Sequence, residues 1–165
     1  MSAAEHLEAV RAAIVARLNT VPDVGVVHDY QRYAGDLRKL AALYVTEVGG
    51  RPQLRGWYVS RVATVETSAV SGSYAATHEW VLRGYMALDD AAESEIVFDR
   101  LVEQIREAFR GDDALGGLVG SIVFDGSEGS AAGVQAQLEP VMFAGVLCHA
   151  ARLTLRTRTY FRSVP

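Results

Sequence analysis

Two stretches of the chain carry hydrophobic residues at the spacing of an α-helix. The first predicts a helix over residues 3–19, in which one face holds Leu7, Val10, Ile14 and Leu18. Ser2 and Glu5 form an S-x-x-E capping box at its start. Val21-Pro22 ends it, because the residue before a proline avoids helical backbone angles.

The second helical pattern is the stronger one and ends at Gly111, a residue suited to a left-handed helix stop. Asp89-Asp90 is expected to cap its start. The predicted apolar stripe consists of Val97, Leu101, Ile105 and Ala108 or Phe109. Its other face is acidic and carries Glu93, Glu95, Asp99, Glu103 and Glu107.

Other stretches have the β-branched content or the alternation that is typical of strands. They predict strands over residues 24–30, 57–66, 78–88 and 146–161. In the third of these, one face is apolar and the other is polar or aromatic; the two sets are Trp80, Leu82, Met86 and Leu88, and Glu79, Arg83 and Tyr85. Gly84 within it indicates a bulge or close packing against a helix.

Three segments are harder to assign. Residues 37–48 fit either a helix or a strand, and residues 68–76 are small and polar, which is typical of a connection. Residues 111–133 are rich in glycine and are expected to hold a strand over 119–124 and a hairpin tip over 125–130, with a return over 134–138. The whole pattern predicts one α+β domain over residues 1–165, with a mixed, mainly antiparallel sheet of about four to six strands against two main helices.

The last predicted strand separates its side chains most clearly. One side holds Leu153, Leu155, Thr157, Thr159 and Phe161, and the other holds Arg152, Thr154, Arg156, Arg158, Tyr160 and Arg162. Four arginines on one side repel one another, so their charge needs compensation. Water and salt, the acidic helix of this chain or of another copy, and the phosphates of a nucleic acid are the three alternatives.

Composition narrows the class of protein. The net charge of −4 argues against a general nucleic-acid coat, although a local cationic strip remains compatible with it. Cys148 is the only cysteine, which fits a reducing compartment. The N-terminus lacks the features of a signal peptide, and no apolar run approaches the roughly 20 residues that cross a bilayer. The expected location is therefore the cytoplasm, without membrane contact.

No pattern for catalysis, a cofactor or a metal emerges. Cys148 and His149 are neighbours in a strand and so point to opposite faces, which prevents a nucleophile–base pair. The four histidines are dispersed, and no phosphate-binding G-K-[ST] or G-x-G-x-x-G is present. Asp89-Asp90 and Asp112-Asp113 are explained as a helix cap and a solvated loop. We expect no enzyme activity, no cofactor and no metal site.

The order of elements, with three local stretches, resembles the tail terminator (tail completion) proteins of long-tailed bacteriophages. The stretches are Arg55-Gly56-Trp57-Tyr58-Val59, residues 78–85 (HEWVLRGY) and residues 94–99 (SEIVFD). The resemblance covers most of the chain. It implies a structural protein of a phage or prophage, made in the host cytoplasm and incorporated in the virion tail.

The resemblance further implies a ring, usually a hexamer, that caps the tail tube, stops its polymerisation and meets the head connector while DNA passes through its centre. The residues expected at the subunit interface or lumen are Arg152, Arg156, Arg158, Arg162, Glu95, Asp99 and Glu103. Alternatives are a head–tail joining or tail tube protein, a small enzyme or ligand-binding domain with a pocket near Trp57, Trp80 and Cys148, and a bacterial accessory domain of the same architecture.

Overall fold

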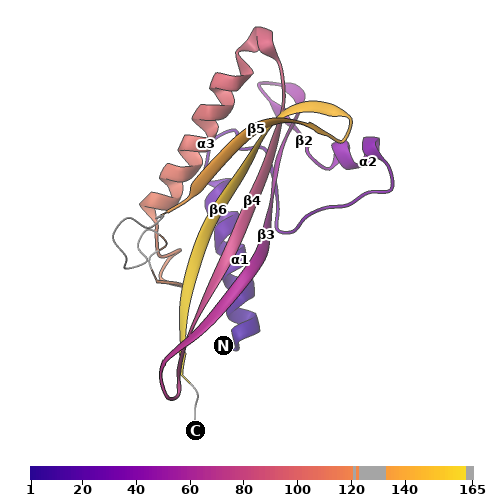
Figure 1. Ribbon diagram of the computed structural model, residues 1–165. Coiled ribbons are helices and arrows are strands. Elements are labelled where there is room, and N and C mark those ends of the chain that lie inside the picture. Colours follow the sequence, from indigo (N-terminus) through magenta and orange to yellow (C-terminus); the bar gives the residue numbers. More distant parts are fainter. Residues whose placement is uncertain (121, 123–132, 163–165) are drawn as a thin grey trace.

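The computed structural model describes residues 1–120, 122 and 133–162. A long, twisted sheet forms the centre of the molecule, and helices α1 and α3 lie against one of its sides (Figure 1). The sheet has six strands, which are mixed but mostly antiparallel, so the predicted α+β class is confirmed.

The elements follow one another along the chain with short connections as far as α3. Their bounds are α1 Ala3–Asn19, β1 Val26–His28, α2 Leu37–Ala42, β2 Val45–Val48, β3 Arg51–Val70, β4 Ser73–Ala87, the 3-10 turn η1 Asp90–Ala92, α3 Ser94–Gly111, β5 Gln135–Phe143 and β6 Val146–Arg162. The order across the sheet is β1-β3-β4-β6-β5, and β2 also pairs with β3. Among the described strands, β1 alone runs parallel to its partner.

The main core lies between the sheet and the two long helices. Helix α1 has the predicted bounds and capping box, and it buries Val10, Ile14 and Leu18 as expected. Helix α3 buries Leu101 and Ile105 as predicted and Phe109 of the alternative Ala108 or Phe109, together with Phe98 and Val102. The prediction for Val97 is wrong, because its neighbour Phe98 takes the inward position and stacks against Trp57.

Gly84 makes room for an aromatic ring rather than for a helix or a bulge. A Cβ placed on Gly84 would lie 2.3 Å from the Trp57 ring on the neighbouring strand. The Trp57 indole is fully buried and donates its N–H to the carbonyl oxygen of Val24 at 3.0 Å. The indole is therefore held in place on both sides, and position 84 accepts no side chain without moving it.

The structure resolves or revises several assignments of the sequence analysis. Residues 37–48 contain both predicted alternatives in turn, with α2 first and β2 after it. Residues 68–76 are not a connection, because β3 and β4 run on to a tight turn at Gly72, which has φ 78°. Asp89-Asp90 does not cap α3, since η1 intervenes and the left-handed Glu93 precedes the helix.

The prediction for the glycine-rich region, residues 111–133, and the return strand after it is confirmed only in part. Within the predicted strand over 119–124, the described residues Val119, Gly120 and Ile122 form bends and no strand. The amide of Gly120 donates to the carbonyl oxygen of Arg158, and this contact holds the segment against β6 without a ladder. The predicted hairpin tip over 125–130 lies outside the described residues. The expected return is present as β5, which continues to Phe143.

The far ends of β3, β4 and β6 extend beyond the helices as a narrow three-stranded arm (Figure 1). A register shift in β3 lies between Arg61 and Ala63. Arg61 pairs with Trp80, which is on the helix side, whereas Ala63 pairs with Glu79, which is on the other side. The extra residue, Val62, therefore changes which residues of β3 face the helices.

A second, smaller cluster covers one end of the opposite side of the sheet. It combines Tyr44, Leu54, Tyr85, Cys148 and Ala150. The Tyr85 ring stacks on Phe143 with centroids 3.8 Å apart, and Tyr44 meets both rings edge-on. Residues of α2 pack against this cluster, so this end of the second face is closed to solvent.

Candidate assembly surfaces

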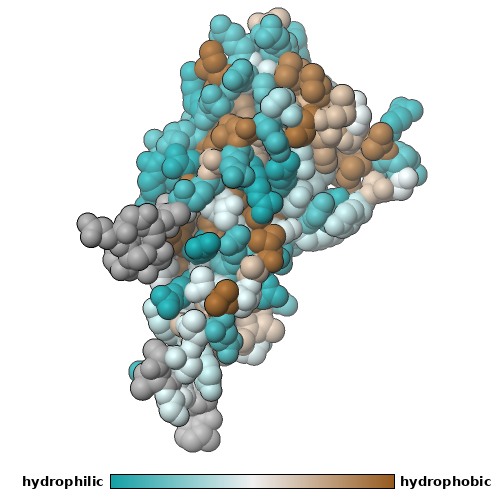
Figure 2. All heavy atoms as spheres, in the orientation of Figure 1, coloured by the Kyte–Doolittle hydropathy of each residue, from teal (hydrophilic) through white to brown (hydrophobic). Residues whose placement is uncertain are grey.

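Strand β6 shows the predicted separation of side chains. Leu153, Leu155 and Thr157 are buried on the helix side, where the exposed fraction of each is 1% or less. Arg152, Arg156, Arg158 and Arg162 are exposed on the other side, and we call these four residues the arginine face. Figure 2 shows hydrophilic residues along the middle of this side, with hydrophobic ones toward the β5–β6 turn and α2.

Carboxylates compensate only part of this positive charge. Arg156 approaches Glu79 on β4 at 3.4 Å, and the nearby Arg83 pairs with Glu139 on β5 at 3.2 Å. Arg158 lies over the ring of Tyr160, with its guanidinium carbon 5.6 Å from the ring centroid. Among the described residues, Arg152, Arg158 and Arg162 have no acidic partner. The arginine face therefore keeps an excess of positive charge.

The acidic residues of α3 divide into two groups. Glu103 is paired with Arg106 and with Arg110 on its own helix, and these contacts hold the pKa of its carboxyl below the usual range. Glu95 and Asp99 are exposed, and neither forms an ion pair within the part of the chain that the structure describes. Negative charge is thus left over at the N-terminal half of α3.

The two charged surfaces lie on opposite sides of the same sheet. Helix α3 packs through Phe98 and Leu101 on the side where β6 presents Leu153 and Leu155. The arginines project from the other side of β6, as the alternation of a strand requires. No described arginine of that face reaches the helix, so of the sequence-based alternatives the pairing of the two surfaces within one chain does not occur.

The side chains that could serve as a nucleophile or a base are used for packing. Cys148 is fully buried in the second cluster, and this burial raises the pKa of its thiol to about 11. His149 points to the other side, where its Nε2 lies 2.8 Å from the Ser94 hydroxyl and its ring stacks on Phe98. Within the described residues, no group of three His, Cys, Asp or Glu could hold a metal ion.

The site imagined around the tryptophans is not formed. Trp57, Trp80 and Cys148 are each 0% exposed, and Cys148 is separated from the two indoles by the sheet. A hollow of about 620 Å³ does lie beside α1 and residues 27–29. Its cation, Arg11, donates to the carbonyl oxygens of Asp29 and Val59 and lies over the Trp80 ring, so it closes the edge of the core.

Sequence reasoning missed a row of exposed apolar residues on β5. Leu138 is 44% exposed and Met142 is 68% exposed, and both lie on the α3 side of the sheet, because they pair with Ala151 and Leu147. The alternation of strand 135–143 was visible in the sequence, but nothing there showed that α3 stops short of covering it. This row adjoins the acidic part of α3.

No described helix has the length and apolar character needed to span a bilayer. No protein-family model matches the sequence, and no curated protein matches it either.

Proposed function

We propose that this protein is a structural component of a phage or prophage tail. It forms a closed ring that caps the tail tube, ends tube polymerisation and joins the tail to the head connector. The ring works by shape and contact, with no bond made or broken. Its partners are further copies of itself, the tail tube protein and the head connector protein, and DNA passes through its lumen. It assembles in the host cytoplasm and remains in the virion tail.

One observation carries this proposal beyond the sequence resemblance. The arginine face and the acidic residues of α3 have opposite charge, lie on opposite sides of the sheet and are incompletely compensated by the residues that the structure describes. A subunit with complementary surfaces on opposite sides binds its copies head to tail, and such a contact repeats until a ring closes or a filament grows. This favours an assembling subunit over a solitary domain.

The test is the assembly state of the purified full chain. Light scattering coupled to size exclusion and negative-stain electron microscopy should show single closed rings, and added rings should shorten the tubes formed by the cognate tail tube protein. A chain that stays monomeric at micromolar concentration would contradict the proposal. Long tubes made by this chain alone would instead identify a tube subunit, and a thermal-shift response to metabolites would favour a ligand-binding domain.

A further inference from the structure

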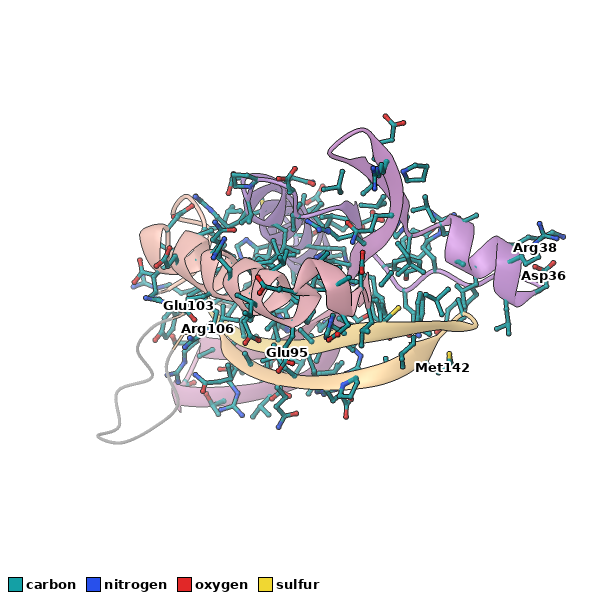
Figure 3. The ribbon with its side chains drawn as sticks, turned by 90° about the horizontal axis from the view of Figure 1, so that it is seen from above. Asp36, Arg38, Glu95, Glu103, Arg106 and Met142 are labelled. Carbon is teal, nitrogen blue, oxygen red and sulfur yellow. The ribbon has the colours of Figure 1, made fainter. Side chains whose placement is uncertain are left out.

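Helix α3 runs alongside the edge strand β5, and two contacts fix this arrangement. At its first residue, the Ser94 hydroxyl lies 2.8 Å from His149, which pairs with Pro140 of β5. Two-thirds of the way along, Arg106 donates to the carbonyl oxygen of Val134, the residue before β5. One side of α3 therefore follows β5, as Figure 3 shows for Glu95, Glu103 and Arg106.

Glu95 and Asp99 lie on this same side of α3. They precede Arg106 by 11 and 7 residues, which is close to a whole number of helical turns, so all three share one stripe. The exposed apolar residues of β5 continue the surface; in chain order they are Ala136, Leu138, Pro140 and Met142. We call Glu95 and Asp99, together with this row, the α3–β5 surface. It combines negative charge with an apolar strip.

Part of the arginine face lies on the three-stranded arm. Its composition is complementary to that of the α3–β5 surface. Val65, Thr77 and Arg158 pair in one row across β3, β4 and β6, and Tyr160 lies in the next row. Val65 is 62% exposed and Tyr160 is 67% exposed. Positive charge is therefore combined here with apolar and aromatic side chains that no other described element covers.

We propose that the α3–β5 surface of one copy binds the arginine face of a second copy. Arg156 and Arg158 approach Glu95 and Asp99, and the Val65–Tyr160 region covers Leu138 and Met142. Glu103 is not part of the contact, because two arginines of its own helix, Arg106 and Arg110, already neutralise it. Among the described residues, Arg156 has the single carboxylate partner Glu79, at 3.4 Å. The charges set register and partner choice, whereas the apolar residues supply buried area.

The contact joins two different surfaces, so it is heterologous, and each copy of a pair keeps its other surface free to bind a further copy. A two-fold dimer would bury the same surface twice and would place like charges together. The inference rests on the proposed function only in taking a second copy as the occupant. It adds which residues form the contact and in which direction the copies are arranged.

The test is a charge exchange between the two surfaces. The pair E95K/D99K and the pair R156E/R158E should each shift assembly to monomer, with about 10- to 100-fold weaker association measured by light scattering against concentration. The quadruple variant E95K/D99K/R156E/R158E restores opposite charges and should restore the ring. R38E, on the exposed α2 (Figure 3), is the charge-changing control and should assemble normally.

Thermal unfolding of each variant checks that the fold is intact, which is expected because all four side chains are exposed. Wild-type rings that persist in both double variants would overturn the inference and leave the proposed function standing. Double variants that dissociate without recovery in the quadruple variant would also overturn the pairing. A wild-type chain that never assembles would contradict the proposed function itself.

Discussion

The two sides of the sheet are made by the same strands and yet have different roles. On the helix side, β6 contributes Leu153 and Leu155 to a core that α1 and α3 close. On the other side, the same strand presents Arg156 and Arg158 to solvent, and the described residues cover one end of that side, with α2 and the aromatic cluster.

Folding stability constrains the residues on the helix side of the sheet much more than those on the arginine face. Residues of the helix side are specified by close packing, where a change of one methylene is felt. Residues of the arginine face contribute little to folding, since exposed ion pairs are worth about 0–1 kcal/mol. Folding stability therefore does not account for their arrangement, and we propose assembly as the role that does.

The sharpest contrast comes from two adjacent residues of β6. Leu155→Ala should lower the free energy of unfolding by about 2–5 kcal/mol, because it leaves a cavity in the main core. Arg156→Ala, one position later, should change it by no more than about 0.5–1 kcal/mol. Urea unfolding of the two variants at a concentration where the wild type is monomeric measures both. Equal losses of unfolding free energy in the two variants would contradict the difference between the two sides of the sheet.

A smaller effect is expected where β4 meets β3. Gly84→Ala should destabilise the protein by about 1–3 kcal/mol, because the added methyl collides with the confined Trp57 ring. Gly111→Ala, at the end of α3, is the matched control, since a Cβ there meets no atom within 4 Å. The control should be neutral or slightly stabilising in the same urea experiment. Similar values for the two variants would mean that the indole relaxes freely.

The last prediction concerns the end of the sheet that α2 and the aromatic cluster cover, on the same side as the arginine face. Burial raises the pKa of the Cys148 thiol to about 11, so at pH 8 the native thiol is almost wholly protonated. Its reaction with a disulfide reagent should be at least roughly 100-fold slower than in the urea-unfolded chain. Absorbance at fixed reagent concentration measures both rates. Fast stoichiometric labelling of the native protein would show that α2 and its aromatic neighbours do not close this end.

Much of the architecture was predictable, because the spacing of the hydrophobic residues in the sequence matches the side of the element that is buried. Helix α1 and strand β6 combine clear caps or strict alternation with one apolar side, and both have their expected bounds to within one residue. The start of α3 was not predictable from Asp89-Asp90, because Asp89 precedes a 3-10 turn without making a side-chain capping hydrogen bond, and α3 begins only after the left-handed Glu93. A residue type that is common at helix starts does not by itself show that its side chain caps a helix.

The candidate surfaces were predictable only in their charges. The alternation of β6 gave the four arginines, and the helical period gave Glu95, Asp99 and Glu103. The ion pairs that neutralise Glu103 depend on the rotamers of Arg106 and Arg110, and the exposure of Leu138 depends on how far α3 extends over the sheet. Both depend on the tertiary structure, which the periodicity of a single sequence does not reveal.

The single extra residue in β3 has a consequence for how this chain can evolve and be engineered. Simple alternation from Trp57 and Val59 would carry Val65 into the interior beneath α1; the offset at Val62 sends it outward instead. Deleting Val62 would leave Arg61 opposite Trp80 and Ala63 opposite Glu79, so Thr64 and Glu66 would stay on the helix side. Keeping Val62 but pairing it regularly would instead exchange the two sides for residues 63–68 and turn Thr64 and Glu66 away from the helices. The strand can therefore lose its bulge without changing which side chains face the helices, whereas it cannot straighten at its present length without exchanging them.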